Sequence, residues 1–170
     1  MSIQSAGILL YRHKDKSVQV LLVHPGGPFW AKKDSGVWSF PKGELKGDES
    51  ALVAAKREFN EETGQKVPAG DLIPLGETKQ SSGKVVYAWA LQADLDAAKV
   101  KCNTFKMEWP PKSGVIREFP ENDRAAWFDL GEAKNKLFPS QSFFVDRLAG
   151  YLQIPEVKPA ETDTPQQSLL

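Results

Sequence analysis

Residues 43–65, GELKGDESALVAAKREFNEETGQ, predict a helix whose last turns are unusually acidic. We expect Asp48 to cap the start of this helix, and Gly64 to end it, because glycine adopts the left-handed conformation of a helix C-cap without strain. The final turns carry Glu58, Glu61 and Glu62. Each acid at that end opposes the helix dipole by about 0.3–1 kcal/mol, and like charges three or four residues apart repel by about 0.2–0.5 kcal/mol more.

The spacing of these three glutamates brings their carboxylates together on one side of the helix. A divalent cation among them would reverse both penalties, and hard ions such as Mg²⁺ and Mn²⁺ prefer oxygen ligands. The alternative is an acidic helix end that simply faces water, as most charge runs do. The residues around the acids decide between these two interpretations.

The whole run fits a longer pattern: Gly, five residues, Glu, seven residues, then Arg-Glu-hydrophobic-x-Glu-Glu-x-Gly. The fixed positions are Gly43, Glu49, Arg57, Glu58, Phe59, Glu61, Glu62 and Gly64. Chance matching of so many fixed positions in a chain of this length is on the order of one in a million. The run therefore resembles the signature of the Nudix hydrolases, with one departure at Gln65, where the family prefers an aliphatic residue.

The resemblance implies an enzyme that binds Mg²⁺, or alternatively Mn²⁺, and hydrolyses a pyrophosphate bond in a nucleoside diphosphate linked to another group. The metal ligands that it implies are the carbonyl of Gly43 and the side chains of Glu58, Glu61 and Glu62. It also implies a catalytic set of Glu58, Glu61, Arg57 and Glu121. Arg57 belongs to that set as the residue that positions the acids together with Glu49.

An acid outside the signature commonly completes the site in this family, about six residues before a strand aromatic. Glu121 stands six residues before Trp127 and is the first candidate for this additional ligand or general base. Glu118 and Glu108 remain as alternatives. A plain surface acid is an open interpretation for all three.

Residues 38–43, WSFPKG, resemble the entry to the signature in Nudix enzymes that split dinucleoside polyphosphates, and related forms act on diphosphoinositol phosphates. We therefore expect Lys42 to contact phosphate and Trp38 to contact the rest of the substrate. The habits of the family make Tyr87 a candidate for stacking on a base, with core packing as the alternative, and Trp109 of residues 99–120 is a further candidate contact. Two other functions stay open. The first is a nucleoside triphosphate pyrophosphohydrolase that clears unwanted nucleotides, and the second is a non-catalytic module that senses a nucleotide.

Short apolar runs predict strands on both sides of the acidic helix, at residues 5–11, 17–23, 71–78, 84–92 and 125–129. Residues 99–120 are expected to form an irregular flap on the substrate side, and Ser140 to cap a last helix that ends near residue 153. These elements predict an α/β protein, a Nudix-type α/β/α sandwich with a mixed sheet between helices. One domain would span residues 1–154, followed by a mobile polar tail at 155–170.

Composition limits the partners of this chain of 170 residues. Lys plus Arg and Asp plus Glu are balanced at 22 each, which gives no reason to expect binding to nucleic acid or to a membrane. A single cysteine, Cys102, excludes an intrachain disulfide and favours a reducing, cytoplasmic setting. The expected partner is a small nucleotide substrate, and a homodimer is left open.

Overall fold

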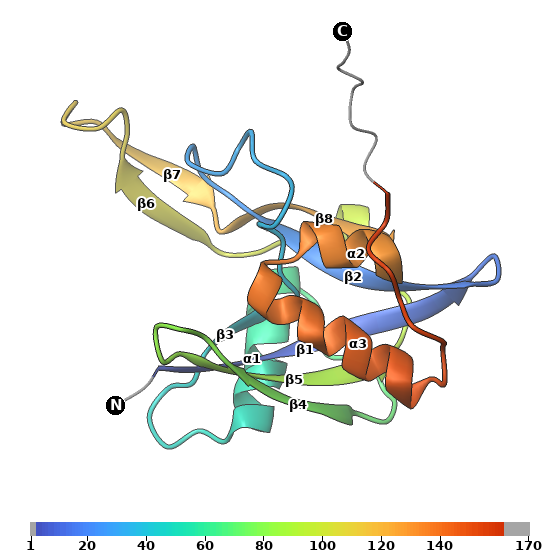
Figure 1. Ribbon diagram of the computed structural model, residues 1–170. Coiled ribbons are helices and arrows are strands. Elements are labelled where there is room, and N and C mark those ends of the chain that lie inside the picture. Colours follow the sequence, from blue (N-terminus) through green and yellow to red (C-terminus); the bar gives the residue numbers. More distant parts are fainter. Residues whose placement is uncertain (1–2, 162–170) are drawn as a thin grey trace, which may run out of the picture.

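The computed structural model describes residues 3–161, and its centre is a six-stranded mixed sheet (Figure 1). The strands of this sheet are β1 (Gln4–Lys14), β2 (Ser17–Pro25), β3 (Lys42–Glu44), β4 (Ile73–Lys79), β5 (Val85–Gln92) and β8 (Asn122–Asp129). They follow the order β4-β5-β1-β2-β8, and the short β3 pairs with β1. The pair β1–β5 is parallel and the other pairs are antiparallel, which confirms the expected mixed sheet.

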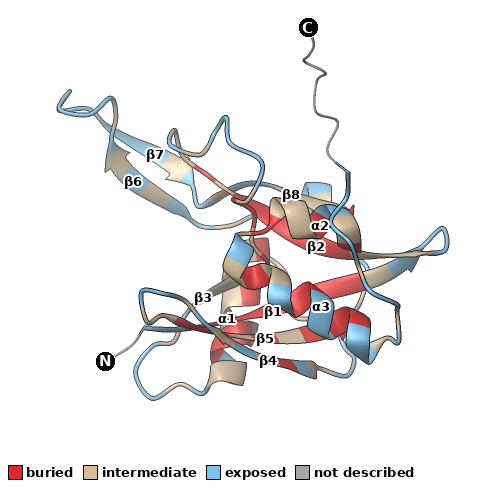
Figure 2. Ribbon diagram, in the orientation of Figure 1, coloured by how far each residue is buried: buried red, intermediate tan, exposed pale blue. Residues whose placement is uncertain are grey.

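Helices cover both faces of the sheet. Helix α1 (Ala51–Thr63) packs Ala54, Ala55 and Phe59 against one face. Helices α2 (Leu130–Lys136) and α3 (Ser142–Tyr151) cover the other, and the short 3-10 turns Ala97–Lys99 and Pro139–Gln141 lie in the connections. Buried residues concentrate between these layers (Figure 2), so the α/β/α sandwich is confirmed. Within residues 3–161, no helix is long and apolar enough to cross a bilayer.

The two ends of α1 differ in how well the sequence predicted them. Gly64 ends the helix as expected, with φ of 72° and its N–H donating to Asn60 O at 2.8 Å. At the other end the N-cap is Ser50, whose hydroxyl accepts from Val53 N at 3.2 Å. The expectation for Asp48 was wrong, because the helix starts at Ala51 and Asp48 lies in the preceding turn.

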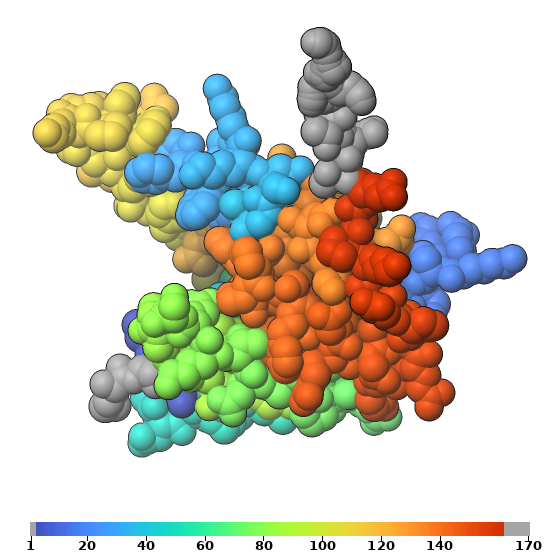
Figure 3. All heavy atoms as spheres, in the orientation of Figure 1, coloured from blue at the N-terminus to red at the C-terminus, as the bar shows by residue number. Residues whose placement is uncertain are grey.

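The region expected to be an irregular flap is mainly a regular hairpin. Strands β6 (Thr104–Glu108) and β7 (Ile116–Pro120) form a separate two-stranded sheet that projects from the domain beside the loop after β2 (Figures 1 and 3). The alternation of polar residues with Phe105 and Met107 is the period of two that a strand requires. The two adjacent prolines in the turn hid this alternation from the sequence interpretation.

The C-terminal part also departs from expectation. Helix α3 begins at Ser142 without a side-chain cap, and Ser140 instead accepts a hydrogen bond from Gln80 Nε2 at 3.2 Å. Residues 155–161, part of the expected mobile tail, lie against α2: Ala160 N donates to Gly131 O at 3.0 Å, and Asn135 Nδ2 donates to Ala160 O at 2.7 Å. The remainder of the expected tail, residues 162–170, falls outside the described residues.

Candidate active site

Arg57 is the organising side chain of the acidic helix end. Its guanidinium donates two hydrogen bonds to Glu49, both at 2.8 Å. It also donates to Glu58 Oε1 at 2.7 Å and Glu61 Oε2 at 3.1 Å. A fifth contact runs to the carbonyl of Glu44 at 3.0 Å. The ionised carboxylate of Glu49 is stabilised chiefly by Arg57 and also by the N–H of Lys46, so its pKa falls to about 2.

The carboxylate of Glu58 lies directly against the backbone of Gly43. A Cβ on Gly43 would stand 2.1 Å from Glu58 Cδ and 2.2 Å from Oε2, far inside van der Waals contact. Gly43 pairs with Ala6 of β1, so this point of contact lies on the sheet face that α1 covers. Only glycine leaves the backbone of β3 and a carboxylate of α1 this close together.

Glu62 is an acid of this group whose pKa is strongly raised. Burial raises its pKa to about 7; the hydrogen bond from Asn122 opposes this change, and the charges of Glu58 and Glu121 add to it. Asn122 Nδ2 donates to Glu62 Oε2 across 60 residues of sequence. Asn122 is itself held by Cys102, whose Sγ accepts from Asn122 N at 3.1 Å and donates to Asn122 O at 3.2 Å.

Of the three acids considered outside the signature, Glu121 is the one that joins the cluster. Burial raises its pKa, and the charges of Glu58 and Glu61 raise it further. Its backbone is fixed on both sides: Gly26 N donates to Glu121 O at 2.8 Å, and Glu121 N donates to Asn103 O at 2.9 Å. The carboxylate of Glu108 instead accepts from Lys112 N and Gly114 N in the hairpin turn, at 2.9 and 3.1 Å. Glu118 lies on β7, opposite Lys106.

The donor set suits a hard divalent cation. The charge of Glu58 helps to raise the pKa of both Glu62 and Glu121, and the charge of Glu121 also helps to raise that of Glu62. Bound Mg²⁺ or Mn²⁺ relieves repulsion of this kind. Among the described residues, no three acidic, histidine or cysteine side chains converge tightly enough to enclose an ion by themselves. Glu58 accepts a hydrogen bond from Arg57, and Glu62 accepts one from Asn122.

Two of the expected substrate contacts lie near the acids. Lys42 stands beside Gly43 on β3, and burial, with the charge of Lys84, lowers its pKa to about 8. Glu62 and Glu58 counteract this change, so the ammonium group lies within electrostatic reach of the acidic cluster. Tyr87 of β5 is half-buried and pairs with Ala6, which places it on the same sheet face as α1.

The other two expected contacts lie elsewhere. Trp38 is 3% exposed, its Nε1 donates to Asp34 Oδ1 at 2.8 Å, and its ring packs edge-to-face against Phe128 at 4.9 Å. The expectation that Trp38 contacts substrate was therefore wrong, because the ring is part of the core. Trp109 directly follows β6, and its ring centroid lies 5.9 Å from that of Phe29.

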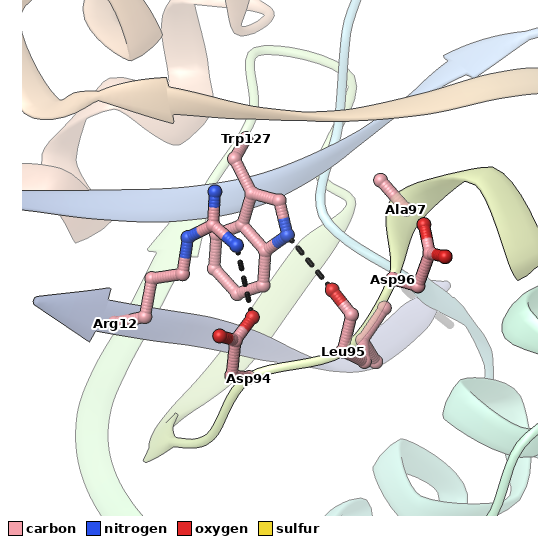
Figure 4. Close-up of a pocket in the computed structure, with 6 residues that line it drawn as sticks. All are labelled: Arg12, Asp94, Leu95, Asp96, Ala97 and Trp127. Carbon is pink, nitrogen blue, oxygen red and sulfur yellow. Dashed lines mark hydrogen bonds and ion pairs between the residues drawn. The ribbon is translucent and has the colours of Figure 1, made fainter. Parts of the chain in front are cut away.

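The acids do not line the cavity of about 600 Å³ shown in Figure 4. That cavity is lined by Arg12, Asp94, Leu95, Asp96, Ala97 and Trp127. Its polar groups pair with each other: Arg12 donates to Asp94 at 2.9 Å and lies 4.2 Å above the Trp127 ring. Trp127 Nε1 donates to Leu95 O at 3.1 Å. None of the signature residues at positions 43–64 lines this cavity.

Asn122 and Gly26 are the site residues that sequence reasoning missed. Asn122 follows Glu121 directly, and an amide next to a candidate base is a signal that could have been considered. Gly26 lies in a glycine- and proline-rich loop whose partner, at position 121, is distant in the sequence. Nothing in the local pattern indicates that contact.

Comparisons with known proteins bear on the family and the fold of this chain. The family model described as NUDIX domain matches residues 1–148. An octanoyltransferase of Myxococcus xanthus is 30% identical over 134 residues, which are 79% of this chain and 33% of that protein. This chain thus spans about a third of the length of the curated relative that it matches.

Solved structures share the fold at low sequence identity. An Ap4A hydrolase of C. elegans, in a binary complex, matches with a TM-score of 0.64 and 19% identity, covering 88% of this chain and 98% of that one. The NUDIX domain of NrtR from Shewanella oneidensis, complexed with ADP ribose, gives 0.58 and 16%, covering 89% of each chain. A MutT protein from Methanosarcina mazei Go1 gives 0.58 and 21%, covering 89% and 96%. With the complete signature at residues 43–64 and a family model that matches 148 of its 170 residues, this chain belongs to the Nudix hydrolase family.

Proposed function

We propose that this chain hydrolyses a pyrophosphate bond in a nucleoside diphosphate-linked substrate with the help of Mg²⁺, or alternatively Mn²⁺. The observation that carries the proposal is the contact of the Glu58 carboxylate with Gly43, next to Glu62 and Glu121, whose pKa values are raised. The metal would be held by the Gly43 carbonyl with Glu58, Glu61 and Glu62. When bound, it would supply charge stabilisation for phosphate oxygens and a more acidic water.

The side chains of the site have three further roles in this scheme: positioning the acids, accepting a proton and binding phosphate. Arg57, fixed by Glu49, holds Glu58 and Glu61 in place, so these acids do not need to reorganise as the substrate arrives. Glu121 is the proposed general base, because its raised pKa makes it a better proton acceptor than an ordinary glutamate. The ammonium group of Lys42 contacts a phosphate oxygen in this scheme. Most of the rate enhancement would then come from positioning and electrostatics.

The favoured substrate is a dinucleoside polyphosphate such as diadenosine tetraphosphate. Support comes from the WSFPKG entry and from the likeness in fold to the C. elegans Ap4A hydrolase. In this proposal Tyr87 and Trp109 are the aromatic contacts to the substrate. The chain would act in the cytoplasm, consistent with its single cysteine, on a small-molecule nucleotide.

A second candidate is a nucleoside triphosphate pyrophosphohydrolase, favoured by the fold shared with the Methanosarcina mazei MutT protein. It would use the same acids and a different base pocket. A nucleotide-sensing module without catalysis is a weaker candidate, because a sensor does not need Arg57 to hold Glu49, Glu58 and Glu61 together.

The test combines a substrate panel with two matched variants. Diadenosine polyphosphates, triphosphates, sugar nucleotides and diphosphoinositols are incubated with the protein and Mg²⁺, and the products are identified by chromatography. We expect Glu62→Gln to lose metal-dependent turnover, while Glu132→Gln, at an exposed site on α2, keeps it. Both variants should unfold at the same temperature as the unmodified protein to within a few degrees. Full turnover by Glu62→Gln would refute the proposed site, and no product from any nucleotide would favour the sensor.

A further inference from the structure

A separate apolar cavity of about 230 Å³ lies between the loop after β2 and the β6–β7 hairpin. Its lining consists of Gly26, Gly27, Pro28, Phe29, Trp30, Phe105 and Met107. No charged side chain lines it, and three of the seven residues are aromatic. Pockets for drug-sized ligands typically measure about 300–1,000 Å³, so this smaller cavity suits a single flat ring system better than a whole nucleotide.

Two glycines bring the loop and the hairpin together around this cavity. A Cβ on Gly26 would stand 1.9 Å from Pro120 O, so any other residue would push the loop away from the end of β7. Gly27 has φ of +95°, and a Cβ there would meet Phe105 Cζ at 2.9 Å. The walls of the cavity are thus in close contact, and the position of Phe105 depends on the missing side chain of Gly27.

The cavity presents aromatic surface to solvent. The Phe29 side chain is 62% exposed, and its ring meets Trp109 edge-to-face at 5.9 Å. Trp30, the next residue along the chain, packs against Phe138 at 6.2 Å between ring centroids. Exposed aromatic rings around an apolar hollow are the arrangement on which nucleobases stack, since every base has a flat π-face.

This cavity adjoins the acidic cluster through the backbone. Gly26, one of its lining residues, donates its N–H to Glu121 O at 2.8 Å. The preceding residue, Pro25, pairs with Asn122, which in turn holds Glu62. One backbone hydrogen bond and one strand pair therefore join a wall of the cavity to Glu121 and Asn122, the residues that border the acidic cluster.

We propose that this cavity binds a nucleobase of the substrate, with the ring stacked among Phe29, Phe105 and Met107 while the phosphates lie at the acids. The proposal rests on the proposed function, because it assumes that the acidic cluster binds the pyrophosphate. Stacking on aromatic side chains changes affinity by about 5- to 160-fold per base. An apolar lining favours contact with ring faces over readout of ring edges, so adenine and guanine nucleotides should bind with similar affinity.

The experiment compares a ligand that carries a base with its base-free counterpart. Dissociation constants for α,β-methylene-ADP and for methylenediphosphonate, both resistant to hydrolysis, are measured by calorimetry with Mg²⁺ for the full chain. Phe29→Ala and Met107→Ala should each weaken binding of the nucleotide by about fivefold or more, while binding of methylenediphosphonate changes less than about twofold. Phe143→Ala, which removes a 38% exposed ring from α3, is the matched control and should change neither affinity.

Each contrary outcome overturns the inference. An equal loss of affinity for both ligands would mean that the substitutions disturb the acids rather than a base site. No loss for either ligand, or no nucleotide binding by the unmodified chain, would show that the cavity does not take a base. If Phe29→Ala leaves nucleotide affinity intact but dissociates a dimer seen by light scattering, the exposed rings serve a second copy of the chain instead.

A failure of the proposed function can be told apart from a failure of the base site by the hydrolysis assay. In that case the unmodified protein releases no product from any nucleotide, whatever the binding data show. Selective loss of nucleotide affinity in Phe29→Ala would still establish the cavity as a base site, and would then favour the sensing module. If the unmodified protein hydrolyses its substrate and the variants Phe29→Ala and Met107→Ala bind the nucleotide as tightly as it does, the proposed base site is refuted while the proposed function stands.

Discussion

The substitution Gly43→Ala tests the chemistry of the candidate site most directly. The new methyl group would lie 2.1 Å from Glu58 Cδ, whereas ordinary contact begins at 3.4 Å. The carboxylate must therefore retreat by about 1.3 Å, because Gly43 lies in a strand paired to β1 and cannot easily move. Metal–oxygen distances tolerate changes of only about 0.2 Å, so Glu58 would leave the coordination sphere.

We expect the turnover of Gly43→Ala to fall about 100-fold, since misplacement of a reacting or binding group by about 1 Å has effects of that size. Stability should change little, because the displaced atoms are the far end of a flexible side chain and Gly43 does not need a positive φ. Initial rates are measured over a range of Mg²⁺ concentrations on the best substrate from the panel. Thermal unfolding is measured on the same samples.

Gly150→Ala is the matched control, because a Cβ at that helical position meets nothing within 4 Å. Its turnover should equal that of the unmodified protein, and its stability should rise by up to about 1 kcal/mol through helix propensity. Turnover of Gly43→Ala at the unmodified rate, with the same dependence on Mg²⁺, would refute the role given to the contact between Gly43 and Glu58.

Three further predictions concern the scaffold of the site. Arg57→Lys should raise the Mg²⁺ concentration for half-maximal turnover about 10- to 100-fold, because an ammonium group cannot span the acids that the guanidinium joins. Measuring the rate at increasing Mg²⁺ concentrations would detect this change. Since the folded-state pKa of Glu49 lies near 2, below its ordinary value of 4.5, its contribution to stability is complete above pH 4.5 and is lost as the pH falls towards 2. Urea unfolding across that range should show a shallower acid decline for Glu49→Gln, and identical slopes would contradict the ion pair. Phe59→Ala, at a fully buried position, should lower the free energy of unfolding by about 3–5 kcal/mol, and a loss below about 1 kcal/mol in urea would be inconsistent with the packing of α1.

The sequence predicted the features that depend on local spacing. Helix α1, its end at Gly64 and the grouping of its acids follow from intervals of three and four residues, which the helix itself converts into geometry. The apolar run at 84–92 likewise indicated a strand covered on both faces, as β5 proves to be. Glu121 was singled out by its distance from Trp127, and the structure brings it near the acids.

Features that depend on distant contacts were missed or misjudged. Trp38 was expected at the substrate, but the packing of residues 24 and 128 around its ring, which no local pattern reveals, places it in the core. The hydrogen bond between Asn122 and Glu62 joins residues 60 positions apart. The choice of Ser50 over Asp48 as the helix cap depends on where the chain turns, because either residue type can serve as a cap.

The β6–β7 hairpin is anchored at its root and free at its tip. Lys101 N donates to Thr63 O at the end of α1, and Cys102 joins Asn122 at the start of β8, whereas residues 111–118 are all exposed. The tip can therefore vary in length and composition without altering the ends that border the carboxylates. Grafting tips from other members of the family onto this root would be a practical way to redirect which compounds are accepted while the hydrolytic apparatus stays as it is.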